Sequence, residues 1–165
     1  MHVGTPSVVS RLCRQAAAQL GRPVACPRLV PDAPIVHFPG VNGLVNSASI
    51  RDFYALAFNT GGEDPRFPAS IHWVTGVGSP TAVKKWALST SRDEVKKPIV
   101  YLGTRRVAGV AVAIYRFPPF PAGGEYGGHT FALVRRGSLM YFASVHGYTH
   151  LDASMAMAVA LALYK

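Results

Sequence analysis

Apolar side chains recur with two different periods along the chain, and the two kinds of segment together predict an α+β fold. Residues 8–20 carry apolar side chains at helical spacing before Gly21, which predicts an amphipathic helix with a glycine at its C-terminal end. The Ser-Pro pair at 79–80 predicts the start of a short second helix. A third helix is predicted over 153–164, with Asp152 as its N-cap, and its lack of a polar face indicates packing on a sheet.

Short runs of β-branched and aromatic residues between these helices predict strands. The predicted strands are residues 35–38, 53–58, 70–77, 99–102, 107–117, 128–134 and 139–146. The second and third pair as a hairpin, and the last four form an antiparallel meander with turns at 103–106 and 135–138. We therefore expect an antiparallel sheet of about five to seven strands, flanked by N- and C-terminal helices.

Length and composition favour a single α+β domain over residues 1–165. A chain of 165 residues, of which 49% are hydrophobic and 15% charged, is long enough to bury a core. Residues 1–40 contain the first helix and an extended arm with five prolines. Residues 41–165 contain the sheet and the other helices.

The order of these elements is helix, strands, short helix, four-stranded meander and closing helix. This order resembles that of PsbP-like α/β/α domains, in which a twisted antiparallel sheet lies between terminal helices. The resemblance implies the same layered arrangement here, and it favours a binding role because many such domains are non-catalytic accessory proteins. No motif of the family occurs in this sequence, so the resemblance assigns no functional residue.

The chain is strongly basic, with 17 Lys and Arg against 8 Asp and Glu, a formal net charge of +9. Such an excess favours polyanionic partners, whether nucleic acid, an anionic lipid surface or an acidic cell-wall polymer. The alternative interpretation is that the charge keeps a rather apolar protein soluble, since no basic run is longer than two residues. No apolar stretch approaches the roughly 18 residues that a transmembrane helix needs.

The two cysteines, Cys13 and Cys26, are too far apart for a CxxC redox or zinc motif. They form either one disulfide between the first helix and the arm, or two buried thiols. The first residues lack the basic and apolar regions of a secretory leader. This leaves open a cytoplasmic protein or an exported one given without its leader. The cysteine pair and the basic charge favour the exported protein.

The C-terminal hairpin carries the candidate ligand-binding site. A turn centred on Arg136 and Gly137 places His129 opposite Ser144, with His146 as the diagonal neighbour of His129 on the same face. A three-residue turn would change the register and separate the two histidines. The predicted ligand-binding residues are Glu125, Tyr126, His129, Ser144, His146, Tyr148 and His150.

Two imidazoles and a carboxylate can bind a divalent metal or act as general acid and base, so His129, His146 and Glu125 suggest a hydrolase. No spacing matches a metal or catalytic motif such as HExxH, so we assign no catalytic residue, metal ligand or cofactor. The structural alternative is that His146 caps the strand end and His129 bonds a loop carbonyl. A nucleophilic Ser144 is disfavoured because it lies within a strand and not on a strained elbow.

Two arginine pairs define a second candidate site. In an antiparallel meander, the turns at Arg105-Arg106 and Arg135-Arg136 fall at one end of the sheet and the histidines at the other. Four arginines there would suit phosphate or carboxylate groups. Alternatively, they solvate the hairpin tips and prevent edge association. We expect no exposed aromatic residues between them that would stack on bases.

Taken together, these patterns predict a non-catalytic, exported domain that binds a ligand or a protein partner. Two alternatives stay open. One is a histidine- or metal-assisted hydrolase, and the other is a domain that binds a polyanion through its arginines.

Overall fold

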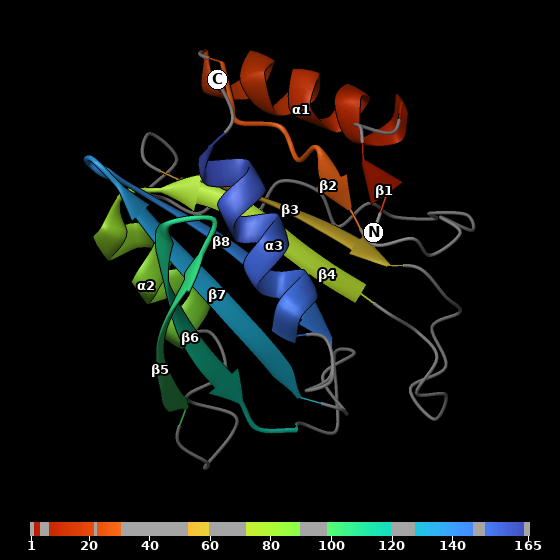
Figure 1. Ribbon diagram of the computed structural model, residues 1–165. Coiled ribbons are helices and arrows are strands. Elements are labelled where there is room, and N and C mark those ends of the chain that lie inside the picture. The colour runs from red at the N-terminus through yellow and green to blue at the C-terminus, as the bar shows by residue number, and fades with distance from the viewer. Residues whose placement is uncertain are drawn as a thin grey trace.

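The computed structural model describes residues 2–3, 7–21, 23–30, 53–59, 72–89, 99–119, 128–146 and 151–163. Its helices are α1 (Ser7–Leu20), α2 (Pro80–Ser89) and α3 (Leu151–Ala162). Its strands are β1 (His2–Val3), β2 (Leu29–Val30), β3 (Phe53–Asn59), β4 (His72–Gly78), β5 (Val100–Val107), β6 (Val110–Phe117), β7 (His129–Arg136) and β8 (Leu139–His146). Figure 1 shows their arrangement. The predicted strand 35–38 lies outside the described residues.

The main sheet has six antiparallel strands in the order β3-β4-β8-β7-β6-β5, and β1 and β2 form a small separate pair. The predicted α+β class, the hairpin of β3 with β4 and the meander from β5 to β8 are therefore confirmed. Helix α2 connects β4, inside the sheet, to β5 at its far edge. Among the strands that the structure describes, β3 and β5 therefore lie at the two edges.

Apolar side chains fill both faces of the sheet, which we call the α3 face and the α2 face after the helices that lie on them (Figure 1). Alternation along each strand produces this division, since successive side chains point to opposite faces. Helix α3 packs chiefly on β7 and β8. The α3-face core includes Val112, Ile114, Ala132, Val134, Ala143, Val145, Met157 and Ala158. The α2-face core includes Val83, Phe117, Phe131, Leu133, Met140 and Phe142.

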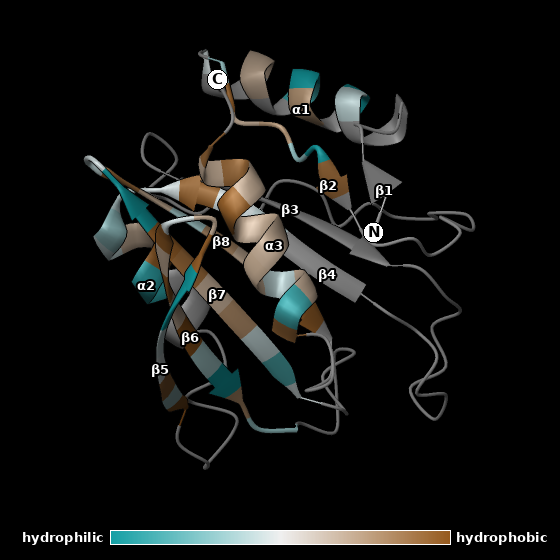
Figure 2. Cartoon of the chain, in the orientation of Figure 1, coloured by the Kyte–Doolittle hydropathy of each residue, from teal (hydrophilic) through white to brown (hydrophobic). Residues whose placement is uncertain are grey.

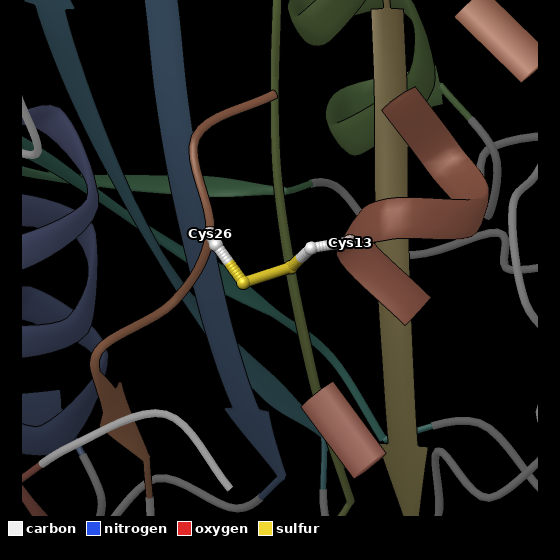
Figure 3. Close-up of a disulfide and its surroundings, with 2 residues drawn as sticks. All are labelled: Cys13 and Cys26. Carbon is white, nitrogen blue, oxygen red and sulfur yellow. A yellow bond between two sulfur atoms is a disulfide. The ribbon is translucent and has the colours of Figure 1, made fainter. Parts of the chain in front are cut away.

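Cys13 of α1 and Cys26 of the segment before β2 form a disulfide, which decides between the two alternatives left open by the sequence (Figure 3). Their Cα atoms are 5.8 Å apart, and both side chains are buried within the α3-face core. A crosslink that closes a loop of 13 residues stabilises a fold by about 3 kcal/mol through the entropy of the unfolded chain.

Helix boundaries follow local capping. The Ala82 N–H donates a hydrogen bond to Ser79 Oγ over 3.2 Å, as predicted from the Ser-Pro pair. Gly21 ends α1 with a φ of 65°, a conformation that glycine adopts without strain. Helix α3, however, begins at Leu151, so Asp152 lies in its first turn, and the predicted start at residue 153 is wrong. A carboxylate in the first turn still interacts favourably with the helix dipole.

The turn between β5 and β6 differs from its prediction. Strand β5 continues through both arginines to Val107, and the chain reverses at Ala108 and Gly109, with φ values of 48° and 78°. Two positive φ values in a two-residue turn match the twist of the strands. Gly103, expected in the turn, lies instead at an irregularity of the β5–β6 register and has a φ of 112°.

A fully buried hydroxyl fastens α3 to the sheet. Ser154 accepts a hydrogen bond from the Val145 N–H and donates one to the Thr130 carbonyl, both over 3.1 Å. Thr130 and Val145 are partners in the β7–β8 register, so one side chain links the helix to both strands.

Candidate functional site

The β7–β8 hairpin has a register two residues away from the predicted one. Gly137 and Ser138 form a two-residue turn, so His129 lies opposite His146 and Phe131 lies opposite Ser144. The predicted opposition of His129 and Ser144 is therefore wrong, and Ser144 is the diagonal neighbour. A shift of two residues preserves the side-chain faces, because the strand period is two.

His129 and Ser144 nevertheless form a direct contact. Nδ1 of His129 and Oγ of Ser144 are 2.8 Å apart, a hydrogen bond between adjacent strands on the α2 face. The imidazole also lies 6.1 Å from the ring of Phe131, measured between ring centroids. The sequence predicted that these two residues share one face, and the hydrogen bond gives the histidine a side-chain partner there.

A hydrogen-bonded serine and histidine resemble a nucleophile and its base, but the burial of this pair argues for a structural role. Ser144 is 0% exposed and His129 4% exposed. A substrate carbonyl has to approach Oγ closely for acyl transfer, and no surface of this hydroxyl is accessible. The contact instead satisfies two polar groups inside the α2-face core, as buried polar groups require.

The structure places one further predicted ligand residue beside this pair, since His146 lies directly opposite His129 in the β7–β8 register. Glu125, Tyr126, Tyr148 and His150 lie outside the described residues, and only the register position of His146 is known. Within the described part of the chain, no group of three or more His, Cys, Asp or Glu residues could hold a metal ion.

The arginine end is organised differently from the predicted single patch. The turns of the β5–β6 and β7–β8 hairpins do lie at the same end of the sheet, and all four arginines are exposed. Figure 2 shows the hydrophilic end of β7 beside its turn. Register pairing divides each arginine pair between the two faces: Arg105 lies opposite Val112 of the α3-face core, whereas Arg106 lies opposite Ala111 on the α2 face. Likewise, Arg136 belongs to the α3 face and Arg135 to the α2 face.

Three of these guanidinium groups bond backbone carbonyls. Arg136 Nη1 donates to the Ala162 carbonyl over 2.6 Å, so it caps the C-terminal end of α3. Arg106 Nη1 donates to Gly109 over 3.1 Å and Arg135 Nε to Gly137 over 3.5 Å, each within its own hairpin. A guanidinium has five N–H donors, so these local bonds position Arg106 and Arg135 and leave donors for a ligand.

One exposed aromatic residue lies on β5 near the end away from Arg105 and Arg106, so it does not lie between the arginines. Tyr101 on β5 is 55% exposed, and its ring centroid lies 5.1 Å from that of half-buried Tyr115 on β6. The Tyr101 and Thr104 hydroxyl oxygens are hydrogen-bonded at 2.7 Å. Residues 99–102 are apolar without alternation, so only the edge position of β5 among the described strands indicates that the tyrosine is exposed.

No family model, curated protein or solved structure matches this chain. The PsbP-like resemblance therefore stays a prediction. Among the described residues, no helix is long and apolar enough to cross a membrane.

Proposed function

We propose that this protein is a non-catalytic, exported domain that binds an anionic partner at the arginine-bearing end of its sheet. The observation that carries the proposal is the convergence of two hairpin turns at one end, with Arg105, Arg106 and Arg135 exposed there. Exposed guanidinium groups on rigid strands suit carboxylate and phosphate groups, which they bind in a bidentate manner.

The distribution of charge supports this end as the binding end. Asp152 is the one acidic residue in the part of the chain that the structure describes. It lies in the first turn of α3, which follows β8 and therefore starts at the opposite end of the sheet from the two arginine turns. Asp152 therefore lies away from the arginines, and the net charge of +9 gives the chain as a whole an attraction for anions.

The disulfide supports the exported location. Structural disulfides persist in oxidising compartments such as the periplasm and the cell exterior, and they are rare in the cytosol of most organisms. The Cys13–Cys26 bond is buried within a core cluster, as a structural disulfide is.

Binding to charged oligomers tests the proposal. We would titrate the protein with oligogalacturonate, polyglutamate and oligothymidylate at several salt concentrations. Replacing Arg105, Arg106 and Arg135 by glutamine should weaken binding and lower the salt slope by about one per lost phosphate contact with oligothymidylate. The matched control removes three other exposed arginines, Arg11, Arg14 and Arg116, and should retain more of the affinity. Salt-independent binding, or none, would contradict the proposal.

The hydrolase alternative has one supporting contact, the hydrogen bond between His129 and Ser144. The burial of this serine and histidine disfavours the hydrolase alternative, because a substrate cannot reach Ser144 Oγ. If the alternative is right, the protein turns over an ester or amide substrate, and Ser144→Ala abolishes that turnover while the circular dichroism spectrum is unchanged. An absence of turnover in the parent protein across such a substrate library would remove this alternative.

A further inference from the structure

The α2 face of the sheet is covered unevenly. Helix α2 packs on β4 and β8, at one side of this face, whereas several residues of β5 and β6 are exposed on it: Tyr101, Thr104, Arg106 and Ala111. We call the uncovered part the open β5–β6 face. The residues that share it are Tyr101, Thr104 and Arg106 on β5, Ala111, Ala113 and Tyr115 on β6, and Arg135 on the neighbouring β7.

One end of the open β5–β6 face is aromatic. Tyr101 and Tyr115 are directly paired in the β5–β6 register, and their rings are tilted by 46°. The hydrogen bond between the Tyr101 and Thr104 hydroxyls fixes the outer ring, although that ring is more than half exposed. A large apolar ring held in place at the surface loses little entropy when a flat ligand packs on it.

The other end of this face is cationic. Arg106 lies opposite Ala111 on β6, and Arg135 lies on the same face of β7, beyond Ala113 and Leu133, where the β6–β7 pairing ends. The two arginines therefore lie on one face of the sheet, on the strands that flank β6. Ala111 is exposed and small, so the residue opposite Arg106 leaves the space beside its guanidinium group unfilled.

We propose that the open β5–β6 face binds an acidic polysaccharide, with a sugar ring packed on Tyr101 and Tyr115 and carboxylates held by Arg106 and Arg135. This inference rests on the proposed anion-binding function and names its ligand class. Tyr115 and Ala111 are four residues apart on β6, about 13 Å in an extended strand, a span that a short uronate oligomer covers. The C–H groups on the flat face of a pyranose pack well on an aromatic ring, and its carboxylate suits a guanidinium.

Two observations favour a glycan over other polyanions. A polyglutamate chain presents carboxylates but no flat apolar ring, so it leaves the tyrosine pair without a role. Single-stranded nucleic acid presents both phosphates and rings, but the disulfide favours an oxidising compartment, where cell-surface and matrix glycans are the abundant polyanions.

The test separates the aromatic contribution from the charge contribution. Tyr101→Ala should weaken binding of oligogalacturonate by about tenfold, the scale of one lost stacking contact, and leave binding of polyglutamate unchanged. Tyr101→Phe retains the ring and should retain most of the affinity. Val100→Ala is the matched control, because Val100 is 47% exposed on the same strand but lies opposite Arg116 on the other face.

A second pair of variants tests the contribution of the arginines and leaves both tyrosines unchanged. Ala111→Glu introduces a carboxylate opposite Arg106 and should abolish oligogalacturonate binding, whereas Ala111→Gln, of nearly equal size, should retain it. Ala111 is exposed, so neither variant disturbs the core.

The outcomes distinguish this inference from the broader proposal. If the arginine variants weaken all the oligomers while Tyr101→Ala weakens none, the glycan inference is wrong and the anion-binding function stands. If oligothymidylate bound more tightly than oligogalacturonate and lost affinity with Tyr101→Ala, the ligand would be nucleic acid and not a glycan. If none of the three oligomers binds, both proposals fail.

Discussion

The two ends of the β7–β8 hairpin use polar residues in opposite ways. At the end where β7 begins, His129 and Ser144 are buried and bonded to each other. At the turn, Arg135 and Arg136 are exposed, and each donates a hydrogen bond to a backbone carbonyl. The buried pair has the residue types of a catalytic site but no accessible surface, whereas the exposed end has accessible charge. Accessibility, and not residue type, is therefore the property that favours the arginine end as the proposed binding site.

The largest expected effect is a loss of stability when the buried pair, His129 and Ser144, is substituted. His129→Ala leaves a cavity and removes the partner of Ser144, so the free energy of unfolding in urea should fall by about 3 kcal/mol. Ser144→Ala should cost about 2 kcal/mol. The double variant should show a coupling energy of about 1 kcal/mol, because the two side chains share one hydrogen bond. If His129→Ala left stability unchanged, the buried end would have no structural role.

A smaller effect is expected where α3 meets this end of the sheet. Ser154→Ala removes a hydroxyl that bonds both the Val145 N–H and the Thr130 carbonyl, and should cost about 1.5 kcal/mol in the same urea experiment. Ser138→Ala is the control, since Ser138 is exposed in the hairpin turn. Equal effects of the two substitutions would contradict the view that Ser154 fastens the helix.

The smallest expected effects on stability are those of the two arginines at the hairpin turn, Arg135 and Arg136. Arg136→Gln removes the cap on the Ala162 carbonyl and should lower thermal stability by about 1 kcal/mol or less. Arg135→Gln should change stability by less than about 0.5 kcal/mol, as surface substitutions usually do, but should weaken oligogalacturonate binding. A reversed order, with Arg135 stabilising and Arg136 binding, would show that the faces are assigned wrongly.

Much of the sheet was predictable from the sequence because the strand period divides side chains between two faces without knowledge of the turn. His129 and Ser144 were placed on one face, and a register error of two residues did not separate them. The turn itself was harder to predict, since several chain reversals around Gly137 are sterically allowed and each gives a different pairing. The disulfide could not be predicted from the sequence alone, because the spacing of Cys13 and Cys26 is compatible with either a bond or two buried thiols.

The exposed tyrosine pair was not predictable. Residues 99–102 are apolar on both faces, a pattern that a buried central strand shares with an edge strand whose faces are partly open. Only the pairing order, in which β5 has β6 as its single described neighbour, distinguishes the two cases. Edge position is a property of the whole sheet, and no local sequence pattern encodes it.

The irregularity at Gly103 has a consequence for how this protein avoids self-association. Strand β5 exposes Val100, Tyr101 and Leu102 at an open edge, which is the feature that promotes uncontrolled growth of sheets between molecules. A bulge interrupts the row of backbone donors and acceptors and increases the local twist, so an incoming strand would lose its register within a few residues. The irregularity at Gly103 therefore makes the edge of β5 a poor template for pairing with a second copy of the chain.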